Sequence, residues 1–291
     1  MSKRLAWWLA IRPATLAASA APVAVGTGVA WAAGKFAAGP ALAALAGAFL
    51  LQVGANFAND VFDFERGADT AERKGPQRAT ASGLVTPAQM KRAMWAVFAA
   101  AGAIGVYLAF VAGWPVIALG IASIAAAYLY TGGPRPYGYI GLGDLSVFVF
   151  FGLAAVIGTY YVQALELSWR AFFAAVPIGL LATAVLVVNN LRDIETDAKA
   201  GKNTLAVRLG DRTTRVYYLL LLAVSYLVPL GMWWHEGGTP WVLLPLLSLP
   251  LALPLAQRMR TQHGLALNGC LVGTARLEVV FGLLFALGLA A

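Results

Sequence analysis

Charged residues are scarce in this 291-residue chain. Only 12% of its residues are Asp, Glu, Lys or Arg, whereas 60% are hydrophobic and the mean hydropathy is +0.73. A soluble domain has about twice this charged fraction, so the composition favours a polytopic membrane protein. The formal net charge of +8 does not indicate a nucleic-acid partner, because the basic residues lie in short segments between apolar runs.

Cysteine and histidine are also nearly absent. The single cysteine, Cys270, excludes an internal disulfide, and His235 and His263 are isolated in the sequence. Neither histidine has the neighbours expected of a metal ligand or a catalytic base. A metal site built from the acidic residues of this chain would therefore have oxygen ligands alone, which suits magnesium.

Long apolar runs dominate the chain instead. Nine of them have the roughly twenty residues that a helix needs to cross a bilayer, and none alternates like a membrane β-strand. The expected spans cover residues 14–33, 41–62, 92–112, 115–132, 142–162, 171–191, 214–233, 240–256 and 268–290. We therefore predict an all-α fold, in which residues 1–291 form a single transmembrane domain of about nine helices around a central cavity.

The positions of lysine and arginine predict the orientation of this bundle, because these residues accumulate in cytoplasmic loops. With the N-terminus in the cytoplasm, all of them fall inside except Lys35 and Arg170, which lie outside, and Arg276, which lies within the last span. The odd number of spans then places the C-terminus outside. Two long polar loops, about 63–91 and 192–213, are cytoplasmic, and there we expect the functional site of a multi-pass protein of the cell (inner) membrane.

A crowded set of polar residues ends the second span. At spacings of i, i+3, i+4 and i+7 along one helix face lie Asn56, Asn59, Asp60 and Asp63. Amides and carboxylates on a membrane helix are costly and require a compensating cation. Asp69 would point elsewhere on a straight helix, so we expect the helix to break near Gly67 and Asp69 to turn back.

A second acidic motif is similar in sequence to the first. The sequence Asn189-Asn190-x-x-Asp193 ends the sixth span, just as Asn59-Asp60-x-x-Asp63 ends the second. Asp197 follows Asp193 at i+4, so a helix places both carboxylates on one face. Such internal repeats in membrane proteins indicate two pseudo-repeated halves that face one central site.

The two motifs together favour a site for magnesium and diphosphate. Two carboxylates about 6 Å apart repel each other by roughly 3 kcal/mol at an effective dielectric constant of 20, so converging acids need a cation. Lys74 and Arg78 follow the first motif and Lys202 follows the second, each near glycines that allow close backbone approach. Acids that hold a metal beside bases that hold phosphate suit the departure of diphosphate. The alternative is that these bases serve only as topology signals.

A third cytoplasmic segment, residues 128–139, is rich in tyrosine, glycine and proline. Its tyrosines either line an apolar channel and face a developing carbocation, or belong to an interfacial aromatic belt. The Gly/Pro loop around Arg135 and Tyr139 favours a functional role for these two residues.

At these residues the chain resembles the UbiA superfamily of intramembrane aromatic prenyltransferases. Asn59-Asp60-x-x-Asp63 with Asp69 is similar to the first acidic motif of that superfamily, and Asp193-x-x-x-Asp197 is similar to the second. The similarity extends from residues 8–15 to the last span, through Asn268 and Arg276. Segments 130–139, 189–197 and 201–206 most resemble the members that prenylate 1,4-dihydroxy-2-naphthoate.

The resemblance implies an activity and a set of residue roles. A polyprenyl group would pass from polyprenyl diphosphate to 1,4-dihydroxy-2-naphthoate, with loss of CO2, to give demethylmenaquinone within the membrane lipid. Two Mg2+ ions bridging the diphosphate would be held by Asp63, Asp69, Asp193 and Asp197, with Asp60 assisting catalysis. Diphosphate or metal-bound water would be oriented by Asn56, Asn59 and Asn189, and the departing diphosphate would be neutralised by Lys74, Arg78 and Lys202. Arg135, beside Tyr139, would bind the naphthoate carboxylate.

Two other functions stay open at this point. One is prenyl transfer to another aromatic acceptor, namely homogentisate, 4-hydroxybenzoate or a chlorophyllide. The spacing from Asp63 to Asp69 is wider than in the 4-hydroxybenzoate members, a departure that concerns the role of Asp69 as a metal ligand. The other is a cation-coupled transporter, in which intramembrane carboxylates and repeats also occur. Arg276 and Glu278 of the last span have no predicted role, since residues two apart on a helix do not face each other.

Overall fold

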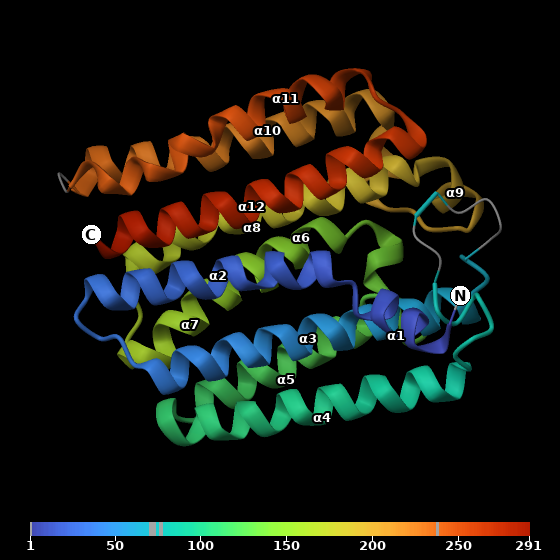
Figure 1. Ribbon diagram of the computed structural model, residues 1–291, viewed down its shortest axis with the longest axis horizontal. Coiled ribbons are helices and arrows are strands. Elements are labelled where there is room, and N and C mark those ends of the chain that lie inside the picture. The colour runs from blue at the N-terminus through green and yellow to red at the C-terminus, as the bar shows by residue number, and fades with distance from the viewer. Residues whose placement is uncertain (1, 70–73, 76–77, 237–238) are drawn as a thin grey trace.

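The computed structural model describes residues 2–69, 74–75, 78–236 and 239–291, and these form helices and turns without a β-strand (Figure 1). Within these residues, eight helical segments are long and apolar enough to cross a membrane, and a shorter apolar helix spans Trp114–Leu129. The all-α architecture and the nine expected spans are therefore confirmed.

The nine segments follow one another through the bundle. They are α1 with α2 (Lys3–Ile11, Pro13–Ala32), α3 (Ala38–Glu65), α4 (Pro87–Ala112), α5 (Trp114–Leu129), α6 with η2 and α7 (Gly143–Val147, Phe148–Ala154, Ala155–Ala164), α8 (Trp169–Arg192), α10 (Leu205–Glu236), η3 with α11 (Pro240–Ser248, Leu249–Thr261) and η4 with α12 (Gly264–Ala266, Leu267–Ala290). The connections between spans include η1 (Tyr137–Ile140) and α9 (Ile194–Lys199). Figure 1 shows α9 and the N-terminus at one end of the bundle, here called the motif end, and the C-terminus at the other.

Local sequence signals fix where several helices begin. Thr86 caps α4 in a capping box with Gln89, and Pro87 occupies the first turn, where its missing N–H costs nothing. Pro13 begins α2 in the same way, directly after Arg12. Both helices begin at the motif end of the bundle (Figure 1).

The helix that carries the first acidic motif ends as predicted. α3 stops at Glu65, and Gly67 adopts a left-handed backbone with φ of 69°. The amide of Ala68 donates to the carbonyl of Asp63 (2.9 Å), which satisfies one of the terminal carbonyls of the helix. The expected break near Gly67 is confirmed, and it returns Asp69 toward the bundle.

The second polar loop is shorter than predicted. Instead of a loop over residues 192–213, the chain forms α9 and then enters α10 at Leu205. Ala206 is buried, so the first turn of α10 gains packing that compensates for the charged residues around it. Gly210, with φ of 76°, then separates this turn from the rest of α10.

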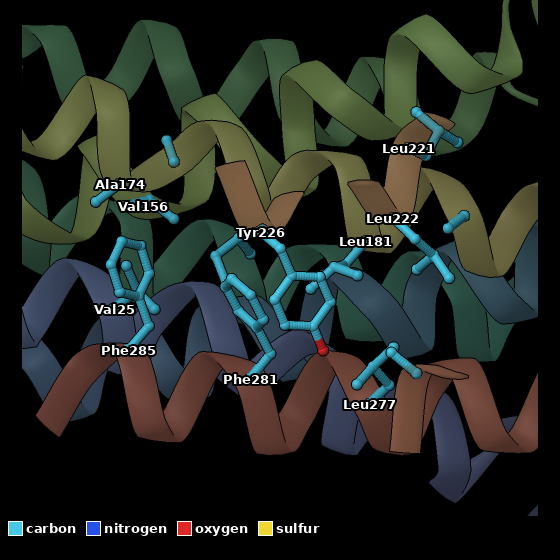
Figure 2. Close-up of a cluster of buried hydrophobic side chains, with 14 of the residues drawn as sticks. Val25, Val156, Ala174, Leu181, Leu221, Leu222, Tyr226, Leu277, Phe281 and Phe285 are labelled. Atoms are coloured by element: carbon cyan, nitrogen blue, oxygen red, sulfur yellow. The ribbon is translucent and has the colours of Figure 1, made fainter. Parts of the chain in front are cut away.

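The largest buried core packs α12 against α2, α8 and α10. Figure 2 shows its aromatic part, in which Tyr226 of α10 lies edge-on to Phe281 with 5.3 Å between ring centroids. Phe285 lies 5.8 Å beyond Phe281, and Leu277 is fully buried in the same cluster. This packing fixes the rotation of α12 about its axis. It therefore also determines which residues of α12 point away from this core.

A glycine contact brings two further spans together. A Cβ atom at Gly152 of η2 would lie 2.5 Å from the Cα of Gly179 in α8, a distance too short for any side chain. Small residues allow the backbones of membrane helices to approach closely. The contact holds the span that begins with α6 against α8, the helix that ends in the second acidic motif.

Candidate active site

A cavity of about 940 Å³ lies among the spans. Its wall is polar at the motif end, where most of the predicted acids and amides lie. Deeper in the bundle the wall is mainly apolar, with residues such as Leu51, Phe150 and Leu186. This division suits a ligand that has a charged head and a long hydrocarbon chain.

Asp63 is the centre of the first acidic motif. Its Oδ2 accepts a hydrogen bond from Nη2 of Arg78 (2.6 Å), and its Oδ1 accepts one from the hydroxyl of Tyr139 (2.8 Å). Nζ of Lys202 lies 3.0 Å from the same Oδ1. Because Lys202 follows the second motif in the chain, this ion pair shows that the two motifs face each other.

Arg78 is held between several carboxylates. Its Nε lies 3.0 Å from Oδ1 of Asp69, so the guanidinium bridges Asp63 and Asp69. Asp60 fixes the turn that carries Arg78, because its two oxygens accept from the amides of Ala79 (3.1 Å) and Thr80 (2.9 Å). Burial alone would lower the pKa of Arg78, but the three acids raise it above its usual value, so the side chain stays cationic.

Tyr139 of η1 lies against two cations. Nζ of Lys202 is 4.8 Å from its ring centroid, and Cζ of Arg66 is 5.6 Å away. Burial and the nearby Asp63 raise the pKa of its hydroxyl, which therefore stays protonated and donates to Asp63. The carbonyl of Tyr139 accepts from the amide of Asn203 (2.9 Å), which ties η1 to the loop after the second motif.

Asp193, at the end of α8, is paired with its neighbour Arg192. Nε and Nη2 of Arg192 donate to the two carboxylate oxygens at 2.9 and 2.5 Å. Nη2 also donates to Asn189 (2.9 Å), and Nη1 donates to Asn268 of α12 (2.8 Å). Arg192 is only 2% exposed. A buried bidentate pair of this kind orders the second motif and joins it to α12.

Asp197 lies one turn beyond Asp193, and both acids line the cavity. The amide of Asp197 donates to the carbonyl of Asp193 (2.8 Å), even though Asp193 leaves helical geometry with φ of −97° and ψ of 7°. The amide of Lys202 in turn donates to the carbonyl of Asp197 (2.8 Å). The i, i+4 spacing therefore predicts correctly that both carboxylates reach the same side of the chain.

Known proteins resemble this chain over most of its length. The model of the UbiA prenyltransferase family matches residues 19–267. The chain belongs to the UbiA prenyltransferase family. This membership confirms the resemblance found in the motifs, and it argues against the alternative of a cation-coupled transporter.

Relatives and solved structures agree with the family assignment. The chain is 46% identical to a 1,4-dihydroxy-2-naphthoate octaprenyltransferase of Mycobacterium tuberculosis, over 89% of this chain and 87% of that protein. It is 42% identical to one of Escherichia coli, over 99% and 96%. The fold is similar to the apo structure of a UbiA homolog from Aeropyrum pernix K1 (TM-score 0.69, 16% identity, covering 92% and 96%). It is also similar to a UbiA homolog from Archaeoglobus fulgidus bound to GPP and Mg2+ (TM-score 0.67, 15% identity, covering 95% and 98%).

The acidic residues of this UbiA family member suit a magnesium ion that a bound anion also coordinates. Among the described residues, no three His, Cys, Asp or Glu side chains converge to hold a metal by themselves. Asp63, Asp193 and Asp197 instead line the cavity from two motifs, with cations between them. Because Mg2+ binds few carboxylates and completes its shell with phosphate and water oxygens, this donor set fits an ion bound together with diphosphate.

Three predicted site residues, namely Asp69, Lys74 and Arg135, do not line the cavity, and Asp69 is paired with Arg78 instead. Lys74 lies outside the cavity wall, where Nζ pairs with Oε2 of Glu195 at 2.8 Å and the hydrogen bond lowers the pKa of Glu195. Arg135 is exposed and is likewise absent from the wall. Lys74 and Arg135 both lie close in sequence to residues that line the cavity, so closeness in sequence alone does not identify the cations of the site.

The amides of the first motif connect α3 to neighbouring elements. Asn59 accepts a hydrogen bond from the hydroxyl of Thr131 (3.0 Å), and Nδ2 of Asn56 donates to the carbonyl of Ile11 (2.9 Å). The next residue, Arg12, lines the cavity with a left-handed backbone (φ 56°), which costs a residue other than glycine about 1–3 kcal/mol.

Arg12 and Arg192 therefore line the cavity, although the sequence analysis gave neither residue a role in the site. The signal for Arg192 was its place directly before Asp193. The signal for Arg12 was the Arg-Pro interruption between two apolar stretches.

Proposed function

We propose that this chain transfers a polyprenyl group from polyprenyl diphosphate to 1,4-dihydroxy-2-naphthoate, with loss of CO2 and diphosphate, to give demethylmenaquinol, the reduced form of demethylmenaquinone. One observation carries the proposal: two acidic motifs meet over an apolar cavity, in a chain whose bacterial relatives are named for this acceptor. The diphosphate would lie at the motif end, and the prenyl chain would extend among the helices.

We propose that two Mg2+ ions are held with the diphosphate by Asp63, Asp69, Asp193 and Asp197. When bound, Mg2+ neutralises charge on the diphosphate oxygens and so favours its departure from the allylic carbon. The side chain of Asp69 is buried and paired with Arg78 outside the cavity wall. It would therefore reach a metal only after Arg78 turns toward phosphate.

Three cations would receive the departing diphosphate. Arg78, Lys202 and Arg192 line the cavity and are already held in place by Asp63 and Asp193. Substrate binding would exchange one set of ion-pair partners for another, so no cation has to be drawn in from solvent. Tyr139 would keep Asp63 oriented through the hydrogen bond from its hydroxyl.

The acceptor carries a carboxylate that requires a cation within the cavity. Arg135 is exposed and outside the wall, whereas Arg12 lines it at the junction of α1 and α2. We therefore assign the naphthoate carboxylate to Arg12 in place of Arg135. The electron-rich ring would then attack the allylic cation that diphosphate leaves behind.

We also propose that the motif end lies in the cytoplasm, with the protein in the cell (inner) membrane. The positive-inside pattern supports this orientation, since Arg12, Arg78 and Lys202 all gather at that end. The N-terminus would be cytoplasmic and the C-terminus outside, in line with their places at opposite ends of the bundle (Figure 1).

The proposal is tested with purified protein, Mg2+, the naphthoate and a ladder of prenyl diphosphates, and the product is identified by mass. We expect demethylmenaquinol, or demethylmenaquinone once air has oxidised it, and the ladder reports the preferred chain length. Parallel reactions contain homogentisate, 4-hydroxybenzoate or a chlorophyllide. A higher kcat/KM with any of these acceptors would overturn the assignment of the naphthoate.

A further inference from the structure

Glu278 of α12 carries a buried carboxyl group that has no partner among the residues that the structure describes. Only 1% of the residue is exposed, and it forms part of the cavity wall. Its neighbours Leu277 and Phe281 pack into the core that fixes α12 (Figure 2). No hydrogen bond or ion pair joins its carboxyl group to any residue in the described part of the chain. Arg276, the nearest cation in sequence, is exposed and faces another direction.

The depth of Glu278 follows from contacts along α12. Arg192 binds Asn268 at the motif end, and Glu278 lies ten residues farther on, about 15 Å along the helix axis. Helical side chains lean toward the N-terminus of their helix, which for α12 is the motif end. The carboxyl group therefore lies between the acidic motifs and the apolar depth of the cavity.

Neighbouring helices leave space beside this group. Gly282 contacts Ala21, which places Glu278 about level with Ala18 of α2. Ala18 is one of the cavity-lining residues and is about 9 Å along the axis from Arg12. An aromatic ring system with polar groups at both ends can therefore extend from Arg12 to Glu278.

A buried carboxyl group without a partner destabilises a protein in an apolar environment, so its retention calls for a ligand that satisfies it. The prenyl chain is a hydrocarbon and offers no hydrogen bond. The aromatic acceptor carries ring hydroxyls in addition to its carboxylate. Because the diphosphate would lie at the motif end, only the acceptor offers a hydrogen bond at the depth of Glu278.

We propose that Glu278 hydrogen-bonds a ring hydroxyl of the aromatic acceptor and thereby positions the ring for attack on the allylic carbon. The inference rests on the proposed function, which supplies the acceptor. Arg12 would hold the carboxylate end of the ring system and Glu278 the opposite end. Glu278 is thus a positioning and specificity residue, and the acidic motifs act on the other substrate.

Kinetics of purified Glu278→Met and Glu278→Gln test this role. We expect Glu278→Met to raise KM for the naphthoate about tenfold to a hundredfold, because a buried hydroxyl loses its partner. KM for the prenyl diphosphate should stay within about twofold. Glu278→Gln keeps a donor and an acceptor, so its KM for the naphthoate should lie between those of wild type and Glu278→Met. Arg276→Gln, on the same helix but exposed, is the matched control and should behave as wild type.

Naphthoates that lack one hydroxyl test whether Glu278 contacts one particular hydroxyl of the acceptor. 1-Hydroxy-2-naphthoate and 4-hydroxy-2-naphthoate are measured as competitive inhibitors of the wild type and of Glu278→Met. In the wild type, removal of the hydroxyl that faces Glu278 should weaken inhibition about tenfold or more relative to removal of the other. In Glu278→Met this ratio should fall toward one.

Several outcomes would overturn the inference. They are an unchanged inhibitor ratio in Glu278→Met, an equal rise in KM for both substrates, or a loss of folding in both variants as measured by thermal unfolding. If only Glu278→Met fails to fold, an unchanged inhibitor ratio in Glu278→Gln overturns it. Prenylation of the naphthoate by wild-type protein tests the proposed function separately, so failure of one is distinguished from failure of the other.

Discussion

Replacement of Arg192 should lower the free energy of unfolding, and the loss should be larger for Met than for Lys. Its guanidinium makes four hydrogen bonds, two to Asp193 and one each to Asn189 and Asn268. Arg192→Met removes them all and leaves the carboxylate of Asp193 buried without its cation, which should cost about 3–5 kcal/mol. Arg192→Lys keeps the charge but loses the planar fork, so we expect a loss of about 2 kcal/mol.

The free energy of unfolding in mixed micelles measures these losses, and a double variant tests their cause. Arg192→Met combined with Asp193→Asn should be more stable than Arg192→Met alone by about 1 kcal/mol or more, because a neutral amide needs no cation. Arg135→Met is the control, since Arg135 is exposed, and should change stability by less than about 0.5 kcal/mol. Wild-type stability of Arg192→Met, or a double variant less stable than the single one, would refute this reasoning.

Three further predictions concern the diphosphate, the packing of the spans and the metal. Lys202→Met should raise KM for the prenyl diphosphate about tenfold, whereas Lys74→Met should change it less than about twofold, and equal effects would contradict the placement of Lys74 outside the cavity. Gly152→Ala should lower the free energy of unfolding by about 1–3 kcal/mol, because its Cβ would meet Gly179, and an unchanged value would show that the two spans can separate without cost. EDTA should abolish prenyl transfer and excess Mg2+ should restore it, while persistent transfer in EDTA would exclude a role for the metal.

The spans and the acidic motifs were predictable because both depend on local patterns. Apolar runs of bilayer length specify helices, and the spacing of Asp63 from Asp69 already required the break that Gly67 provides. The helical turn at Leu205 was not predictable in this way. It is stabilised by the burial of Ala206 against other elements, which the charged sequence around it conceals.

The cations of the site were the least predictable part, because a basic residue at a membrane boundary looks the same whether it orients the chain or binds a substrate. Arg192 turns inward and pairs with Asp193, whereas Lys74 turns outward to Glu195. Arg12 and Arg135 differ in the same way, one lining the cavity and the other exposed. Only tertiary contacts distinguish the members of each pair.

The central claim is that the two acidic motifs act together on one magnesium diphosphate. The most direct measurement is the rate of prenyl transfer by Asp63→Asn and Asp193→Asn as Mg2+ is raised to saturation. The account predicts that each variant loses about a hundredfold or more in rate and needs more Mg2+ for half its maximal rate. Near-normal rates for either variant at saturating Mg2+ would contradict it.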